Sequence, residues 1–461
     1  MKFYSSALAT IVVCQQAVAF TTTTTSFPAA ARTRSTSTLY STPGTGGNVV
    51  LRPTVSDSEE DSTKIFDTLS IGGCHVHRYK SASFNTDDTG VNYVMWYHGR
   101  SVAQDKDESL PPLSTGRIGR AVSKNGLIWE KDTTGSSDAD IEGVSVGLNE
   151  ESWWGFDTAH LGVGSVLLPM TTPAVMTEGG IYLMYYFGGN YEETPINDYT
   201  AADMPEDLTI KGMKMRIGVA VSQDGETWGR VEGDDPTGAC MPPYEASNPE
   251  TEMKDDKKSS LTIKEELYCG WPEVVVRTDN KGNPSKGFFM YYSTMTKGDK
   301  QKCLGVAVSA DGFRWYKRGI CLEPSVGDTS SMDDAGVARS QVVRNAVYSE
   351  LEGTWSDAPG YTMYYEGVSS LDNKHRILMA TSPDGETWTK RGVVLDIGED
   401  GDDAWDCDGV GSPNILRIDD GAQRMYYTGK KGKDTAIGVA KMEFESTTWT
   451  REQSSFTFVE A

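Results

Sequence analysis

The sequence predicts an all-β protein, a five-bladed β-propeller, and three observations lead to this prediction. One phrase recurs five times along the chain, and an aromatic segment precedes each copy. An Asn-Gly or Asp-Gly pair, the favoured signal for a tight turn between antiparallel strands, lies inside four of the copies. Five repeats of three or four short strands favour a propeller over a sandwich, because repeated sheets of this size stack around a central axis.

The aromatic segment of each repeat reads as a half-buried strand. Its copies are rich in Tyr, Trp, Phe and Met, and aromatic residues in particular pack well on a pleated surface. They lie at residues 93–100, 181–189, 288–294, 361–367 and 424–429.

The recurring phrase reads as the next strand followed by a turn. Gly and Ala accompany Val and Ile in it, which suits a strand packed closely against its neighbours. We expect the Asp-Gly pair to form a two-residue hairpin turn, and the tryptophan after it to begin another strand and pack between sheets. Glu445-Ser446 replaces the turn in the last copy, as is common in terminal repeats. The copies lie at residues 117–131, 216–230, 304–319, 376–392 and 436–451.

The bulk composition limits the classes of function. The chain has 461 residues and a formal net charge of −23. An acidic surface repels phosphate backbones, so nucleic acid is not expected as a partner. No segment approaches the roughly 20 apolar residues that a membrane-spanning helix needs. The seven cysteines are dispersed without a CxxC pair, which argues against zinc-ribbon and thioredoxin-like sites and predicts mostly free thiols.

The N-terminal region reads as a targeting sequence. Residues 1–19 combine a positive start, an apolar segment and a small-residue cleavage site, as a signal peptide does. Residues 20–56 are rich in Ser and Thr and contain Arg but no acid, the composition of a transit peptide or disordered linker. Their junction at Phe20 resembles the bipartite presequence of algae with secondary plastids and implies import into a plastid, with secretion as the alternative. Residues 57–461 are assigned to the propeller domain.

A carboxylate lies upstream of each aromatic segment, near the start of the strand that a propeller places innermost. Asp67 aligns with Asp157, Asp333 aligns with Asp406, and Glu273 follows a Trp-Pro pair in the third repeat. Acids that converge on one axis repel each other, which raises some of their pKa values and suits a general acid. Aspartates at the same place in each repeat can instead cap turns through Asx hydrogen bonds. Both interpretations stay open for the aspartates, whereas a functional role is favoured for Glu273.

Other polar residues fall on or beside the same innermost strands. His75, His77, His160 and Arg339 belong to this set, and Asp408 lies beside the innermost strand of the fifth repeat. The histidines match no known zinc-ligand spacing, so we predict no metal site. They are interpreted as buried side chains or as contacts to a ligand.

The repeat motifs resemble a known family. W-D-x-D-G-V-G-S-P at residues 405–413, together with M-Y-Y-x-G and G-x-A-x-S-x-D-G-x-x-W, is similar to sequences of the five-bladed propellers of the arabinanase, levansucrase and invertase superfamily. That superfamily includes the family 43 and family 32 glycoside hydrolases. The resemblance covers roughly residues 60–452.

The resemblance also implies a set of site residues. Asp67 would be the base or nucleophile, Asp157 would orient the reacting groups, and Glu273 would protonate the leaving oxygen. The innermost strand of the first repeat, residues 72–78, carries no acid of its own and departs here from the family pattern. As substrate-binding residues we expect His75, His160, Trp271, Asp333, Arg339 and Asp408.

The predicted function is hydrolysis or transfer of a glycosyl group of a furanoside or an oligosaccharide, with no cofactor. The acid missing from the first innermost strand favours the alternative, a non-catalytic propeller that binds carbohydrate or protein. Residues 191–213 and 234–266 form long acidic insertions, and we expect substrate choice to reside there.

Overall fold

The computed structural model describes residues 47–56, 62, 64–80, 91–101, 110, 115–133, 141–168, 181–200, 204–247, 260–399 and 404–453. The predicted signal peptide and residues 20–46 lie outside this set, so plastid localisation stays a prediction. Strands dominate the described chain, which confirms the all-β prediction. The helical segments described are two 3-10 turns, η1 (Ile196–Asp198) and η3 (Thr329–Ser331). Among these residues, no helix is long and apolar enough to cross a bilayer.

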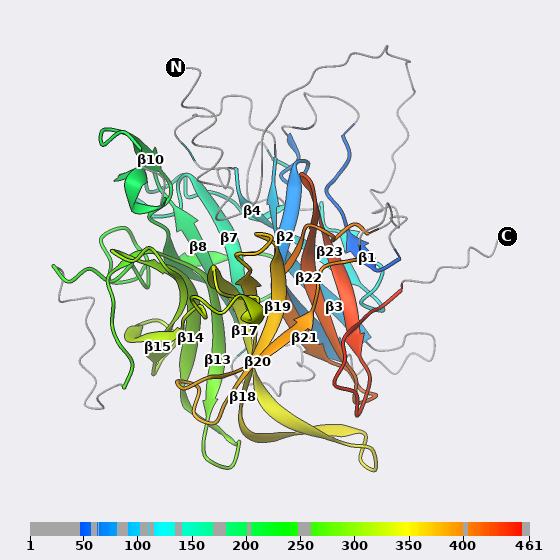
Figure 1. Cartoon of the computed structure of the whole chain (residues 1–461). Helices are drawn as coiled ribbons and strands as arrows, with labels where there is room; N and C mark the ends of the chain where they lie inside the picture. Colours follow the sequence, from blue (N-terminus) through cyan, green and yellow to red (C-terminus); the bar gives the residue numbers. More distant parts are fainter. Residues whose placement is uncertain are drawn as a thin grey trace, which may run out of the picture.

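The strands can be grouped into five successive antiparallel units of four strands each (Figure 1), and the fourth and fifth units belong to one nine-stranded sheet through a parallel pairing of His375 with Gly409. Unit one contains β2 (Ser70–Lys80), β3 (Val91–Arg100), β4 (Arg117–Ser123) and β5 (Glu130–Lys131). Unit two contains β7 (His160–Leu167), β8 (Tyr182–Gly189), β11 (Arg216–Ser222) and β12 (Gly229–Val231). Unit three contains β13 (Glu266–Thr278), β14 (Pro284–Thr296), β15 (Lys302–Ser309) and β16 (Tyr316–Leu322).

Unit four contains β17 (Gly336–Ser349), β18 (Thr354–Val368), β19 (His375–Ser382) and β20 (Thr389–Leu395). Unit five contains β21 (Gly409–Arg417), β22 (Gln423–Lys431), β23 (Asp434–Met442) and β24 (Thr450–Arg451). Four short strands lie outside this pattern. One is β1 (Val49–Leu51); β6 (Val144–Val146) pairs with β4, and β9 (Glu193–Pro195) pairs with β10 (Thr209–Lys211).

The first strands of the five units surround a common centre. β2 contacts β7, β7 contacts β13, β13 contacts β17, β17 contacts β21, and β21 contacts β2. The apolar core lies between successive units rather than at this centre, because each hydrophobic cluster draws residues from two neighbouring sheets or from a sheet and its insertion. Polar side chains on the first strands are therefore free to face the centre.

The N-terminal segment of the described chain belongs to the last sheet. β1 (Val49–Leu51) pairs antiparallel with β23, and all three residues of β1 are buried. This strand precedes residue 57, the expected start of the propeller domain. Residues 49–51 are a structural strand of unit five rather than part of a linker.

In each unit a buried acid, just before or at the start of the first strand, bonds to residues of the second and fourth strands. In unit one, the Tyr97 hydroxyl donates to Asp67 Oδ2 at 2.9 Å, and Lys131 Nζ lies 2.6 Å from the same oxygen. Asp67 is 1% exposed. The acid thereby joins the start of the first strand to the second and the fourth strand of its own unit.

This triad of acid, tyrosine and cation recurs in all five units. In unit three Glu266 takes the place of the aspartate. The other four triads are Asp157 with Tyr186 and Arg230, Glu266 with Tyr292 and Lys317, Asp333 with Tyr365 and Lys390, and Asp406 with Tyr427 and Arg451.

The glycine of the M-Y-Y-x-G motif makes room for the triad aspartate. A Cβ atom on Gly367 would lie 2.8 Å from Cβ of Asp333, and one on Gly99 would lie 2.7 Å from Cβ of Asp67. Real Cβ atoms do not approach so closely, so a larger residue would push the acid out of its site. In unit three Thr294 stands at the glycine position, and there the acid is a glutamate that reaches in from farther away.

The turns inside the recurring phrase are longer than expected. Six residues, 223–228, separate β11 from β12, so the Asp-Gly pair does not form a two-residue hairpin. Asp224 Oδ1 instead accepts the backbone N–H groups of Glu226 and Thr227, and Ser222 Oγ accepts that of Gly225. Gly225 has φ of +74°, which explains why glycine stands there.

These turns also join neighbouring units. Tyr185 of unit two donates its hydroxyl to the carbonyl of Gly312 in the turn of unit three at 3.0 Å, and Trp315 of that turn packs edge-on against Tyr185. The corresponding bonds are Trp96 to Gly225, Tyr291 to Gly385 and Tyr426 to Gly126. The tryptophans thus pack between sheets as the sequence predicts.

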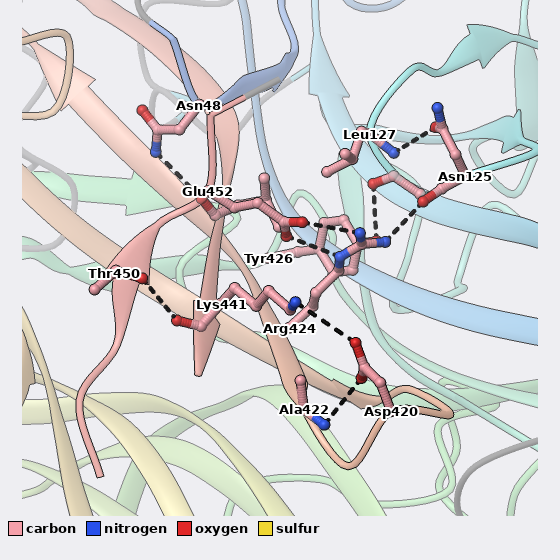
Figure 2. Close-up of polar contacts among 12 residues, drawn as sticks. Asn48, Asn125, Leu127, Asp420, Ala422, Arg424, Tyr426, Lys441, Thr450 and Glu452 are labelled. Carbon is pink, nitrogen blue, oxygen red and sulfur yellow. Dashed lines mark hydrogen bonds and ion pairs between the residues drawn. The ribbon is translucent and has the colours of Figure 1, made fainter. Parts of the chain in front are cut away.

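Figure 2 shows the junction between unit five and unit one. Arg424 on β22 binds both carboxylate oxygens of Glu452, at 2.8 and 2.9 Å, and also donates to the carbonyl of Asn125 in the turn of unit one at 2.7 Å. The Tyr426 hydroxyl donates to the carbonyl of Gly126. The last unit is therefore bonded to the first by the same kind of contact that joins the others.

Six cysteines lie in the described chain, and none of them forms a disulfide, in agreement with the prediction of free thiols. They are Cys74, Cys240, Cys269, Cys303, Cys321 and Cys407.

The triad predicts a large stability loss for Asp333→Asn. The substitution keeps the shape of the side chain but leaves Lys390 without its counter-charge, which should lower the free energy of unfolding by about 2–4 kcal/mol. Asp334→Asn is the matched control, because the neighbouring Asp334 is only half-buried and bonds Ser370, and it should cost less than about 1 kcal/mol. Urea unfolding measures both, and equal losses would contradict a structural role for the triad.

The junction of units five and one predicts that alanine destabilises the protein more at one glycine than at another, although both glycines have positive φ. A Cβ on Gly126 would lie 2.6 Å from the Tyr426 hydroxyl, whereas one on Gly432 would meet nothing within 4 Å. Gly432→Ala should therefore lower the free energy of unfolding by about 1 kcal/mol, through backbone strain alone. Gly126→Ala should lower it by about 2–3 kcal/mol. Thermal unfolding of the two variants tests this, and a Gly126→Ala as stable as Gly432→Ala would show that the contact does not hold the junction.

Candidate functional site

All five first strands carry a β-bulge at the same level. The skipped residues include Gly73, Gly164, Trp271, Arg339 and Ser412. Trp271, Arg339 and Ser412 have φ of +49°, +39° and +48°, a region that residues with a Cβ rarely adopt. Such strain costs of order 1–3 kcal/mol per residue and gathers at functional sites.

Side chains of the preceding unit hold the bulges in place. The backbone N–H of Arg339 donates to Ser293 Oγ at 2.8 Å, and that of Gly73 donates to Thr428 Oγ1 at 2.8 Å. The N–H of Ser412 donates to Glu366 Oε2 at 3.1 Å. The accepting residues all follow the second tyrosine of the M-Y-Y motif, so this position of the second strand sets the geometry of the next first strand.

The bulges form the floor of a cavity at the ends where the first strands begin, which we call the upper cavity. Three cations, Arg100, Arg339 and Lys430, line it against two carboxylates, Glu366 and Asp408. The protein as a whole carries a net charge of −23, so this surplus of positive charge is local. The other polar lining residues are Ser70, His98, His375, Ser412, Thr428 and Thr435, and Trp271 supplies an indole.

Glu366 is the buried acid of the upper cavity. Arg339 Nη1 lies 3.2 Å from its Oε2, and His375 Nδ1 contacts its Oε1. Burial alone would raise the pKa of Glu366, but the charges of Arg339 and His375 hold it at about 2. The carboxylate is therefore ionised at neutral pH.

The cations of the upper cavity are themselves desolvated. Burial, assisted by the charge of Arg339, lowers the pKa of Arg100 to about 10, and Arg100 Nε donates to Ser70 Oγ at 2.8 Å. Burial also lowers the pKa of Lys430, although Asp408 opposes the shift. The guanidinium of Arg339 lies 5.0 Å from the ring centroid of Trp271, which in turn packs on Phe187. The cavity thus holds positive charge in a partly dry place, where it attracts anions most strongly.

The insertion of unit two supports the tryptophan. Ile196, Ile210 and Met213 are buried in one cluster with Tyr268, and Trp271 packs against this cluster. This segment falls within the acidic insertion at residues 191–213, so that insertion has an apolar inner face beside the cavity.

Directly below the bulges, one polar residue from each unit forms a second level. Ser165 Oγ accepts the N–H of Val274 at 3.1 Å, and Asn414 Oδ1 accepts the N–H of Val76 at 3.0 Å. Gln341 accepts the N–H of Ile415 in the same way. His75 and Glu273 hold the equivalent positions, immediately before Val76 and Val274.

Glu273 is the carboxylic acid among the five residues of the second level, and its burial perturbs its pKa. Its carboxyl is 6% exposed and accepts a hydrogen bond from the backbone of Val342, and no ion pair forms with it among the described residues. Burial raises its pKa well above the usual range, despite the opposing backbone hydrogen bond. Burial therefore favours the protonated form of Glu273, whereas Glu366 is ionised.

The structure gathers five of the predicted site residues at the centre. Trp271, Arg339 and Asp408 line the upper cavity. Glu273 and His75 line a smaller middle cavity, which shares Trp271, Arg339 and three further lining residues with the upper one. A larger hollow of about 680 Å³ lies between units one and two, but it contains no bulge residue.

The expectation that the repeated aspartates face the centre requires correction. Asp67, Asp157 and Asp333, and with them Asp406, are at most 1% exposed, line none of the central cavities, and belong to the structural triads. Because these carboxylates are buried and bonded to a tyrosine and a cation within their own sheet, a ligand in the central cavities does not reach them.

His160 is also structural. It is 1% exposed, and its Nε2 donates to the carbonyl of Gly212 at 2.8 Å, away from the central cavities. The expectation that it binds substrate is corrected for this reason.

Sequence reasoning missed Arg100, Glu366, His375, Lys430 and His98, which all line the upper cavity. The repeats contain a pattern that marks two of these residues, His98 and Glu366. The residue after the second aromatic position of each M-Y-Y motif varies between units, as His98, Phe187, Ser293, Glu366 and Thr428, while its neighbours repeat. All five of these residues contact the bulges or line the cavity.

Buried histidines predict a pH-dependent stability. Burial lowers the pKa of His77 and of His160 to about 4, although a backbone hydrogen bond opposes the shift in each. Because the unfolded chain binds these protons near pH 6.5 and the folded chain only near pH 4, stability is complete above pH 6.5 and falls as the pH drops toward 4. His160→Gln should reduce the slope of unfolding free energy between pH 6 and 5 by about 1.4 kcal/mol per pH unit. Urea unfolding across this range tests the prediction, and an unchanged slope would contradict it.

Comparison with known proteins supports the fold. A solved structure described as a glycoside hydrolase shares 17% identity, with a TM-score of 0.50, over 90% of this chain and 94% of that one. A second shares 13% identity, with a TM-score of 0.50, over 88% of this chain and 98% of that one. It is described as a member of the GH130 family of mannoside phosphorylases, which contains glycoside hydrolases that target β-1,2 mannosidic linkages in Candida mannan.

Sequence comparison finds a shorter match. An uncharacterised protein of Mycobacterium tuberculosis strain H37Rv, Rv1502, is 34% identical over 139 residues, which are 30% of this chain and 39% of that protein. A protein of strain CDC 1551, also uncharacterised, matches to the same extent. The match thus spans well under half of these relatives. No family model matches the chain. The comparisons therefore give an all-β fold shared with glycoside hydrolases.

Proposed function

We propose that this protein is a five-bladed β-propeller enzyme that cleaves a glycosidic bond in the upper and middle cavities. Each unit would be one blade, because the first strands contact one another in cyclic order and the fifth unit bonds the first. The fold likeness to a protein described as a glycoside hydrolase is consistent with this.

One observation carries the proposal. Two carboxyl groups beside Trp271 and Arg339 have pKa values moved in opposite directions: that of Glu273 is raised by burial, and that of Glu366 is held at about 2. Glycoside hydrolysis needs such a pair, one acid that keeps its proton and one that remains charged.

The chemistry follows from these two states. Glu273 would donate its proton to the departing glycosidic oxygen, and water would attack the anomeric carbon and pass a proton to the carboxylate left on Glu273, which restores the acid. The Glu366 carboxylate would stabilise the positive charge that develops on the sugar ring. Trp271 offers an apolar face on which a sugar can stack.

The surplus of cations indicates the class of substrate. Three cations, Arg100, Arg339 and Lys430, line the upper cavity with two carboxylates, Glu366 and Asp408, so the lining has one more cation than carboxylate. A glycoside that carries a carboxylate or phosphate group would complement this charge. Inorganic phosphate, as the acceptor of the glycosyl group in place of water, would complement it equally.

A specific observation favours a second candidate, a non-catalytic propeller that binds carbohydrate. Glu273 holds the same position as Ser165, Gln341 and Asn414, which accept hydrogen bonds from the next first strand. The acids that the family resemblance assigns to catalysis on the first two strands, Asp67 and Asp157, are structural.

Glu273→Gln separates the two candidates. Gln341 shows that a glutamine at this level still accepts the backbone N–H of the next strand, so the variant should fold normally and lose only the acidic proton. We expect kcat/KM to fall by about 100-fold or more. The assay is a panel of aryl furanosides and pyranosides, including uronides and phosphorylated sugars, with and without inorganic phosphate.

Glu366→Gln should lower kcat/KM in the same assay, and Glu350→Gln is the control for both variants, since Glu350 is exposed at the tip between β17 and β18. Binding of the same sugars without turnover, with equal affinity in wild type and Glu273→Gln, would contradict the enzymatic proposal and favour the binding propeller.

A further inference from the structure

The opposite end of the centre carries a second group of arginines. Arg78, Arg344 and Arg417 each lie three residues after the polar residue of the second level, at the far ends of β2, β17 and β21. These strands are neighbours in the cyclic order. All three arginines line a cavity below the second level, which we call the lower cavity.

The carboxylates near the lower cavity balance only two of the three charges. Arg78 binds Asp419 through two bonds of 2.8 and 2.5 Å, and Arg344 lies 3.4 Å from Asp357. Arg417 has no carboxylate within ion-pair distance among the described residues. One positive charge therefore remains at this end of the centre.

Arg417 is buried and incompletely bonded. It is 7% exposed, its Nη2 donates to the carbonyl of Arg344, and its Nε has no hydrogen-bond acceptor. Nη1 of Arg344 also lacks an acceptor with hydrogen-bond geometry. Buried donors of charged groups without an acceptor are rare in folded proteins and call for a partner.

The wall beside Arg417 is built by a feature of unit four alone. The hairpin of β17 and β18 extends beyond the other strands, as the yellow ribbon in Figure 1 shows. Trp355 on this extension donates its Nε1–H to the carbonyl of Ile418 at 2.8 Å, and its ring lies 5.3 Å from the guanidinium of Arg417. The indole fixes the arginine in place before any ligand arrives.

The rest of the lower cavity is lined mostly by apolar residues, and its other polar lining residues are His75, His77, Glu273 and Gln341. Val76, Val166, Val275, Val343 and Leu416 are among its lining residues. An ion that enters such a cavity meets little competing water, so its attraction to the arginines is strong. Two guanidinium groups with unused donors fit the oxygen atoms of a phosphate or carboxylate group.

We propose that the lower cavity is a binding site for a compact oxyanion, the phosphate or carboxylate group of a small molecule, held by Arg417 and Arg344. The lower cavity shares no lining residue with the upper cavity, and it meets the middle cavity at His75 and Glu273. The site stands whether or not the protein cleaves glycosides.

Inorganic phosphate, titrated calorimetrically into the full-length chain at constant ionic strength, is the first probe, and acetate is the second. Phosphate can also bind the upper cavity, so the comparison is made in Arg339→Gln. We expect this variant to keep one phosphate site, and Arg339→Gln/Arg417→Gln to bind phosphate about tenfold more weakly or worse. Stronger binding of acetate than of phosphate would identify a carboxylate ligand.

Arg339→Gln/Arg314→Gln is the matched control, since Arg314 is 68% exposed on the outer surface, and it should bind like Arg339→Gln. Equal affinities in Arg339→Gln with and without Arg417→Gln would overturn the proposal, and so would the absence of phosphate and acetate binding at millimolar concentrations. Thermal unfolding gives a second readout. A purely structural Arg417 predicts that Arg417→Gln lowers the melting temperature without changing the response to phosphate, which would also overturn it.

Discussion

The triad of buried acid, tyrosine and cation is the interaction on which the rest of the structure depends. It ties the start of each first strand to the second and fourth strand of the same unit, as Asp67 does with Tyr97 and Lys131. The bulges lie a few residues farther along the same strands, so their position follows from the triad. Because the bulges turn Trp271 and Arg339 toward the centre, the charge and shape of the upper cavity rest on acids that never touch it.

Most of the fold could be predicted from the sequence, because its repeats are explicit. The five aromatic segments became the second strands, and the recurring phrase became the third. Two features could not be predicted in this way. The pairing of β1 with β23 joins residues almost the whole chain apart, and no local pattern marks it. The Asp-Gly turns are longer than a hairpin because Asp224 and Ser222 bond the following backbone, a choice that the dipeptide alone does not reveal.

The site was predicted less well, and the reason is instructive. The aspartates were singled out because they repeat. A residue that repeats in every unit is expected to have a structural role common to all units, which here is the triad. A site on the axis is built once, from residues that differ between units. Glu366 and His98 are such residues, and each stands at one position of an otherwise constant motif. Trp271 and Arg339 were predicted because they lie on the first strands. Only the backbone geometry shows that β-bulges orient these two residues.

The strand at the N-terminal end of the described chain has a consequence for how the protein is made. The sheet of unit five holds β1 on one side of β23 and β24 on another part of the same strand, so it needs residues from both ends of the described chain. Synthesis delivers these residues at opposite times, and the first four units can assemble while the fifth still waits for its own strands. Contacts of such long sequence separation form slowly. Until they form, β1 lacks its partner strand β23. The apolar residues 49–51 therefore stay unpaired in the sheet until β23 has been synthesised.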